Sequence, residues 1–310
     1  MQEKKRKLSH VEIMARAALL CAAILWGSTF VAVSSTNDFF RPNFLLAIRF
    51  LGAGFILSVI FFKKLKMLNK KHLITGLRLG VIMFAGYSLQ SMAITTAGGL
   101  PGRCAFLVAT YCVLVPFVNA AVSRTTPNRY NIIAAIICLT GILCISLPDL
   151  MSEKLGGMSA GDALSLLSSV VFAVYIVLLP KLIRDLDAVL ITITQFAVAG
   201  ICAALVSALF ENNGATVWNV QSVSTLLYLT VLCTAVCMLL ETFGQKHTPA
   251  PTAALLFSLE SVAGIAFSII FTDERLTLNL IIGCICIFAS IFISERKTAK
   301  QKAAEQTSDD

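Results

Sequence analysis

Four ionisable side chains lie inside long apolar stretches of this sequence: Arg49, Arg78, Glu241 and Glu260. A charge in hydrocarbon costs at least about 2.5–3.5 kcal/mol, so such groups usually face a cavity or a partner. Glu260 is about ten residues into its stretch, which corresponds to about 15 Å and the middle of a bilayer. We expect it either to face a cavity, where it would contact an amine or carry a proton, or to be hydrogen-bonded within the protein.

The other three ionisable residues lie nearer the ends of their stretches. Arg49 could extend outward, pair with a carboxylate such as Glu260, or bind the carboxylate of a substrate. Arg78 and Glu241 are expected to reach the lipid headgroups with their long side chains. A second interpretation places Glu241 at the rim of a cavity with Gln90, because the two residues occupy similar places in their stretches.

Uncharged polar and aromatic residues extend the candidate site. Gln90 and Gln195 carry large amides that are costly to hide in lipid, so we expect them to face a cavity. For the aromatic residues, packing between helices is favoured over a place in a pocket wall. The candidates for substrate binding or coupling are therefore Glu260, Arg49, Gln90, Glu241, Gln195, Trp26, Tyr111 and Tyr175.

The composition indicates where such residues must sit. Hydrophobic residues make up 57% of the 310 residues and charged residues 14%, against about 25% charged in an average soluble domain. The mean hydropathy is +0.83, and a soluble fold cannot bury that much apolar surface. These values exclude a soluble enzyme, a disordered regulator and a nucleic-acid-binding module, and they indicate a protein of the lipid bilayer.

Ten stretches are long and apolar enough to cross a bilayer, which takes about 20 residues. They are too continuously apolar for barrel strands, so the sequence predicts an all-α integral membrane protein. The predicted transmembrane helices cover residues 15–34, 43–62, 73–97, 101–121, 130–147, 160–180, 188–209, 223–243, 250–271 and 277–294.

The basic residues predict the orientation of these helices. With the N-terminus in the cytoplasm, 19 Lys and Arg fall in cytoplasmic segments and 4 in external ones. Positive charge collects on the cytoplasmic side of membrane proteins, so both termini are predicted to be cytoplasmic. The predicted location is the cytoplasmic (inner) cell membrane.

Ten helices divide into two halves of five, and an odd number makes the halves face opposite ways. Inverted repeats of this kind are common in secondary transporters. Weak sequence echoes favour the division, such as Phe50 with Phe196 and Gly54 with Gly200. The predicted parts are a cytoplasmic tail, a first repeat, an external connector, a second repeat and a second tail, at residues 1–14, 15–147, 148–159, 160–294 and 295–310.

Several motifs occur in the same order as in a known family. They are ILWGSTFV (24–31), AIRFLGAG (47–54), AFLVATYCVLVP (105–116), ETFGQKHTPAPTAAL (241–255), FSLESV (257–262) and DERLT (273–277). In this order the chain resembles the EamA-type transporters of the drug/metabolite transporter superfamily, over about residues 15–295. It departs from the family pattern with Glu241 where many members have Gln, Ser261 where many have Pro, and Thr272-Asp273 before Glu274.

The resemblance implies export of small metabolites, often amino-acid-like or amphipathic compounds, from the cytoplasm. The alternative within transporters is an importer or exchanger of sugars, nucleotide sugars or other polar metabolites. The expected partners are a small-molecule substrate, the lipid bilayer, a coupling proton on Glu260 and a second copy of the chain in a homodimer, with no nucleic acid.

Enzymatic and ATP-driven chemistry lack their usual signals. The three histidines (His10, His72, His247) are scattered, and the ten cysteines show no metal-ligand spacing. No G-x-x-x-x-G-K-[ST] loop is present, so transport would draw on an ion or substrate gradient. We expect no enzyme activity, metal or cofactor. Pro116 is expected to interrupt the fourth helix.

Overall fold

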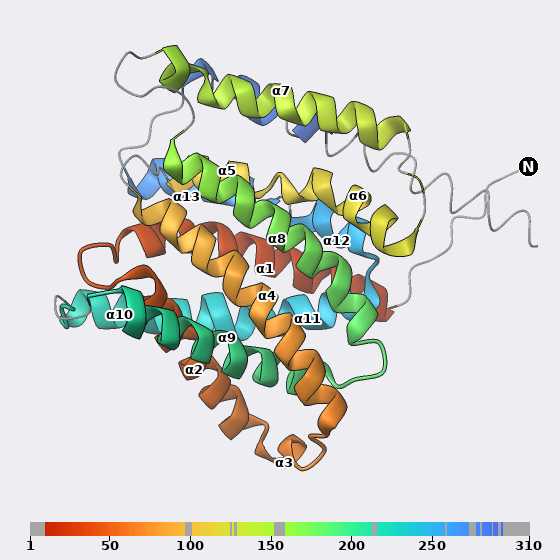
Figure 1. Ribbon diagram of the computed structural model, residues 1–310, viewed down its shortest axis with the longest axis vertical. Helices are drawn as coiled ribbons and strands as arrows, with labels where there is room; N and C mark the ends of the chain where they lie inside the picture. Colours follow the sequence, from red (N-terminus) through yellow and green to blue (C-terminus); the bar gives the residue numbers. More distant parts are fainter. Residues whose placement is uncertain are drawn as a thin grey trace, which may run out of the picture.

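The structure is a computed structural model. It describes residues 10–96, 101–124, 126, 129–151, 159–212, 216–257, 259–272, 277–279, 281–286, 288–290 and 293. Over these residues the chain forms helices and no strands (Figure 1). The all-helical prediction is confirmed to this extent.

Eight helical stretches are long and apolar enough to cross a membrane. In the first half they are α1 (His10–Ser34), α2 (Pro42–Ile60), α4 (Lys70–Thr95) and the pair α5 (Pro101–Val108) and α6 (Tyr111–Ser123). In the second half they are α8 (Ala160–Leu182), α9 (Ala188–Phe210), the run α10 (Val220–Thr230), η2 (Val231–Val236) and α11 (Cys237–His247), and the pair α12 (Ala250–Phe257) and α13 (Leu259–Phe271).

The remaining helices are shorter or less apolar. A four-residue helix, α3 (Phe62–Leu65), lies between α2 and α4. Two apolar helices at Ile132–Gly141, within α7 (Arg129–Met151), and at Ile281–Ser290 correspond to the predicted fifth and tenth spans. Figure 1 shows α7 along one edge of the molecule, next to α6.

Side-chain caps fix where several helices begin. The Asn69 side chain accepts hydrogen bonds from two backbone N–H groups in the first turn of α4, and the Asp187 side chain does the same for α9. Ser159 and Asp162 cap each other's backbone N–H at the start of α8, and Asn219 and Ser222 do so for α10. Such capping boxes satisfy N–H groups that have no partner within the helix.

The central helices run back and forth between two ends of the molecule (Figure 1). We call them the Lys64 end, where α3 lies and α9 begins, and the Arg103 end, where α5 and α8 begin. In the middle, α1 packs on α11 and α13, while α4 packs on α8 and α9. The α2–α9 contact is the largest between helices of different halves, and it closes the side away from α7.

Contacts between the two halves follow a symmetric pattern. The packing of α1 on α11 and α13 is matched by that of α8 on α4 and on α5 and α6. Residues at matching places in the two halves also meet. The rings of Phe50 and Phe196 stack with centroids 5.7 Å apart. Contacts between matching positions are what a two-fold relationship between two halves produces.

The fourth span breaks at a different place from the one predicted. The helix is interrupted at Ala109 and Thr110, and α6 continues through Pro116. The Thr110 hydroxyl donates to the Leu107 carbonyl at 2.7 Å, and the N–H of Cys112 bonds only three residues back. A side-chain hydroxyl that competes for backbone carbonyls disturbs a helix, so Thr110 is the better explanation of the break.

Candidate functional site

A cleft lies between the central helices of both halves. Its lining comes from α1, α4, α5 and α6 in the first half and from α8, α11, α12 and α13 in the second. The space between the side chains is about 480 Å³ with open solvent included, and about 30 Å³ of it can hold the centre of a water molecule. The second volume admits about two waters, so a larger ligand requires the lining side chains to move. The lining residues are Trp26, Thr29, Tyr87, Gln90, Val108, Tyr111, Phe172, Tyr175, Ile176, Glu241, Phe257 and Glu260.

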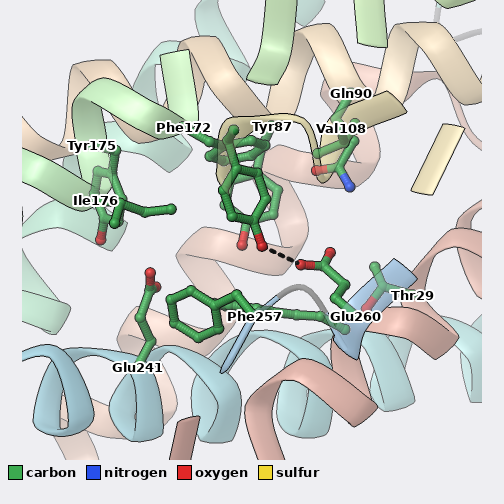
Figure 2. A pocket seen from close by; sticks show the side chains of 12 residues that line it. Thr29, Tyr87, Gln90, Val108, Phe172, Tyr175, Ile176, Glu241, Phe257 and Glu260 are labelled. Atoms are coloured by element: carbon green, nitrogen blue, oxygen red, sulfur yellow. Dashed lines mark hydrogen bonds between the residues drawn. The ribbon is translucent and has the colours of Figure 1, made fainter. Parts of the chain in front are cut away.

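Glu260 reaches the cleft from the first turn of α13 (Figure 2). Its carboxylate accepts a hydrogen bond from the Tyr111 hydroxyl at 3.3 Å, so the two halves meet at this pair. Gly27 of α1 allows α13 to approach closely, because a Cβ there would lie 2.8 Å from the Glu260 carbonyl oxygen. The backbone contact between α1 and α13 therefore determines where the carboxylate stands.

The sequences of the two halves can be aligned so that Tyr111 and Glu260 correspond. Aligning Ala105 with Ala254 and Val113 with Val262 places Tyr111 opposite Glu260. The hydrogen bond between them is thus a second contact between corresponding residues of the two halves, after the ring stacking of Phe50 and Phe196.

Glu241 points into the cleft from α11 (Figure 2). One carboxylate oxygen accepts a hydrogen bond from Gln245 Nε2 at 2.7 Å, and the other has no hydrogen-bond partner among the described residues. The expectation that Glu241 extends to the lipid headgroups is wrong, because only 3% of the residue is exposed. The predicted place beside a cavity with Gln90 matches the geometry, since both residues line the cleft.

Aromatic side chains form much of the remaining wall. Tyr87 packs edge-on against Phe172 with centroids 5.1 Å apart, and Trp26 packs against Phe257 at 5.5 Å. The indole N–H of Trp26 donates to the Cys233 carbonyl at 3.1 Å. For the aromatic candidates, the sequence favours packing between helices over a place in a pocket wall. In the structure, Trp26, Tyr111 and Tyr175 all line the cleft.

Two of the predicted site residues lie behind the wall. Gln195 does not line the cleft, and its side-chain oxygen accepts from the Tyr175 hydroxyl at 3.0 Å. Arg49 is 1% exposed and donates through Nε to the Thr234 hydroxyl at 3.2 Å. Arg49 and Glu260, both described, form no ion pair within 4 Å. The structure therefore places Arg49 inside the bundle, against a hydroxyl and not a carboxylate.

The partner of Arg49 lies on a feature that the sequence did not predict. Residues Val231–Val236 form a π-helix, in which Thr234 Oγ1 donates to the carbonyl of Leu229, five residues back. Inserted turns of this kind often mark functional sites. The same turn supplies the Cys233 carbonyl to Trp26, so it links the buried arginine to the cleft wall.

Six lining residues were not among the predicted candidates for a chemical reason. They contribute hydroxyl groups and apolar surface, like many residues of any membrane helix, and they are Thr29, Tyr87, Val108, Phe172, Ile176 and Phe257. Only the packing of helices selects them. Among the described residues, no group of three or more His, Cys, Asp and Glu could hold a metal ion.

The chain has relatives among known proteins. The EamA-like transporter family matches it twice, over residues 14–147 and 159–295. An uncharacterized transporter of Archaeoglobus fulgidus is 26% identical over 91% of this chain and 85% of its own length. The uncharacterized transporter YoaV of Bacillus subtilis is 21% identical over 92% of this chain and 97% of its own.

A solved structure shares the fold. A crystal structure described only as that of a protein superposes with a TM-score of 0.61 at 16% identity, and covers 91% of this chain and 96% of its own. The likeness supports the helical arrangement seen here. Because the family match covers most of its length, the chain belongs to the EamA-like transporter family.

Proposed function

We propose that this protein is a secondary active transporter, which exports a small amino-acid-like or amphipathic metabolite across the cytoplasmic membrane by alternating access. The observation that carries the proposal is the cleft, because both halves line it and each contributes polar groups. A binding site between two halves lets one half rock against the other around a bound molecule.

Two features support ten helices in two inverted repeats. The family matches the two halves separately, and the packing of α1 on α11 and α13 is matched by that of α8 on α4 and on α5 and α6. An odd number of spans in each half then gives opposite orientations. The excess of Lys and Arg at the Lys64 end supports a cytoplasmic position for that end and for both termini.

Glu260 is the proposed coupling group. It is the lining carboxylate with the greater exposure, 8% against 3% for Glu241, and it accepts a hydrogen bond from the Tyr111 hydroxyl. A carboxylate that faces a cleft can exchange a proton with a substrate or with water as access alternates. Glu260→Gln removes the titrating group and retains the size of the side chain.

The test is metabolite profiling of the medium from cells that overproduce the wild type, Glu260→Gln or Asp38→Asn. Asp38 is an exposed carboxylate outside the cleft, so its substitution is a matched control. We expect one compound to accumulate outside with the wild type and Asp38→Asn but not with Glu260→Gln. Equal accumulation with all three would contradict the role of Glu260. Depletion of a compound from the medium would favour the alternative, an importer or exchanger of sugars, nucleotide sugars or other polar metabolites.

A further inference from the structure

We propose that the substrate of this cleft is an organic monocation, namely an amine with an aromatic or apolar body and no free carboxylate. The inference rests on the proposed function, because it concerns the cargo of the same cleft. It narrows the substrate from small metabolites in general to one charge class.

The cleft wall contains acidic side chains and, among its described residues, no basic ones. Glu241 and Glu260 line it, and none of the twelve lining residues is Lys, Arg or His. The buried guanidinium of Arg49 lies behind the wall and donates to Thr234. Two carboxylates that face one cleft without a basic residue favour a cationic occupant.

The hydrogen bonds of Glu241 leave an acceptor unused. Its second carboxylate oxygen is buried and has no hydrogen-bond partner among the described residues. Buried polar atoms are nearly always paired, so one that faces a binding cleft indicates a partner that arrives with the ligand. A protonated amine supplies up to three N–H donors and can satisfy this oxygen.

The rest of the wall suits the body of such a cation. Six of the twelve lining residues are aromatic: Trp26, Tyr87, Tyr111, Phe172, Tyr175 and Phe257. Ring faces attract cations and pack against apolar or aromatic bodies. Figure 2 shows Phe257 next to the space that Glu241 and Glu260 both face, so a single small molecule could contact a ring and a carboxylate together.

The same wall disfavours an amino acid. The carboxylate of a zwitterion would enter a cleft with two carboxylates and no basic side chain. A buried charge without a partner is strongly unfavourable. A decarboxylated amine avoids this cost, so the two classes of ligand should separate clearly.

Binding can be measured independently of transport, because the chain has two tryptophans and Trp26 lines the cleft. Trp218 is 57% exposed, and Trp218→Phe leaves Trp26 as the fluorescent reporter. The purified single-tryptophan protein would be titrated with phenethylamine, phenylalanine, phenethyl alcohol and 3-phenylpropionate. These probes share one ring and differ in charge.

We expect phenethylamine to bind at least about 10-fold more tightly than the other three probes. Glu241→Gln and Glu260→Gln, each in the Trp218→Phe background, should weaken its affinity about 10- to 100-fold. Asp38→Asn should leave the affinity within about 2-fold. Circular dichroism identifies a variant that fails to fold, and the second carboxylate variant then decides the result.

Two outcomes would overturn the proposal. One is equal or tighter binding of phenylalanine or phenylpropionate than of phenethylamine. The other is unchanged phenethylamine affinity in both carboxylate variants. Flux measurements in proteoliposomes separate this proposal from the proposed transport function. Transport of an anion or a zwitterion without amine binding would support a transporter and overturn the cationic substrate. Selective amine binding without flux of any probe would support the cation site and overturn the transport function.

Discussion

The first turns of α8 and α9 invite a direct comparison, because they lie at opposite ends of the molecule and are built alike. Each helix has 23 residues and an aspartate at its start, within the first turn of α8 and just before the first residue of α9. Each aspartate is paired with a basic residue from the first half. The partner of Asp162 is Arg103, and the partner of Asp187 is Lys64. The difference is in how the two pairs are made.

At the Arg103 end the pair is bidentate and largely buried. Arg103 Nε donates to Asp162 Oδ1 at 2.9 Å, a terminal guanidinium nitrogen donates to Oδ2, and the side chains are 12% and 3% exposed. At the Lys64 end, a single hydrogen bond of 2.7 Å joins Lys64 to Asp187, and the side chains are 40% and 26% exposed.

The neighbouring contacts follow the same division. At the Arg103 end, the Glu211 carboxylate accepts both backbone N–H groups of Asn43 and Phe44 at the start of α2. At the Lys64 end, Lys246 donates to the Leu186 carbonyl and Lys181 to the Ser123 hydroxyl, the second of these on an exposed surface. We infer from this difference that the Lys64 end separates more easily, and we predict that the cleft is reached from there.

The largest effect is expected from Asp162→Asn. The substitution leaves the Arg103 guanidinium without its carboxylate in a nearly buried place, and loss of one partner of a buried pair costs about 3–5 kcal/mol. We expect the free energy of unfolding in detergent micelles to fall by about 3 kcal/mol. Asp38→Asn, the same change at an exposed position, is the control. If Asp162→Asn lowers the free energy of unfolding no more than the control does, the Arg103 end is not held more strongly than the Lys64 end.

A smaller effect is expected from Glu211→Gln at the same end. The amide keeps one acceptor oxygen for the N–H groups of Asn43 and Phe44 but loses the negative charge at the start of α2. Charge-assisted hydrogen bonds and helix-terminus charges are worth about 1–2 kcal/mol together. Thermal unfolding should show a loss of that size, and an unchanged midpoint would mean that the carboxylate is not what holds α2 to α9.

At the Lys64 end, Lys64→Ala should change stability by no more than about 0.5 kcal/mol, because exposed ion pairs contribute little. Its effect should appear in access to the cleft. Acrylamide quenching of Trp26 in the Trp218→Phe background should increase with Lys64→Ala and stay constant with Lys66→Ala, a neighbouring exposed lysine. Loss of stability comparable to that of Asp162→Asn would contradict the comparison.

The smallest effect concerns pH. Partial burial raises the pKa of Asp187, but the Lys64 hydrogen bond and the N–H groups of Leu190 and Val189 together hold that pKa below its ordinary value. A lowered folded-state pKa means that the stabilisation is complete above the unfolded value of about 3.9 and is lost as the pH falls through the folded value. Trp26 quenching should therefore stay constant from about pH 5 to 8 and increase only below about pH 4. An increase near neutral pH would point to another group.

The sequence predicted the helical architecture because apolar stretches of bilayer length leave few alternatives. It also predicted Glu260 and the pairing of Gln90 with Glu241 around a cavity, since large polar groups in lipid need partners. Their roles in binding remain predictions. Arg49 could not be placed, because its partner Thr234 is one hydroxyl among many in such helices.

Some features had no usable signal, and one had a signal that was overlooked. The π-helix at Val231–Val236 and the break at Thr110 arise from hydroxyl groups that compete with the backbone, which residue type alone does not specify. The capping role of Asp162 could have been anticipated, because Ser159 followed three residues later by an acidic residue is the pattern of a capping box.

Hydrogen–deuterium exchange of the wild-type protein in lipid nanodiscs tests most directly the claim that the two ends of the cleft are held unequally. Mass spectrometry would follow peptides that cover the first turns of α8 and α9. The account predicts that amides of Val189 and Leu190, which Asp187 holds, exchange markedly faster than the amide of Asp162, which Ser159 holds. Equal exchange at the two ends, or slower exchange at α9, would contradict it.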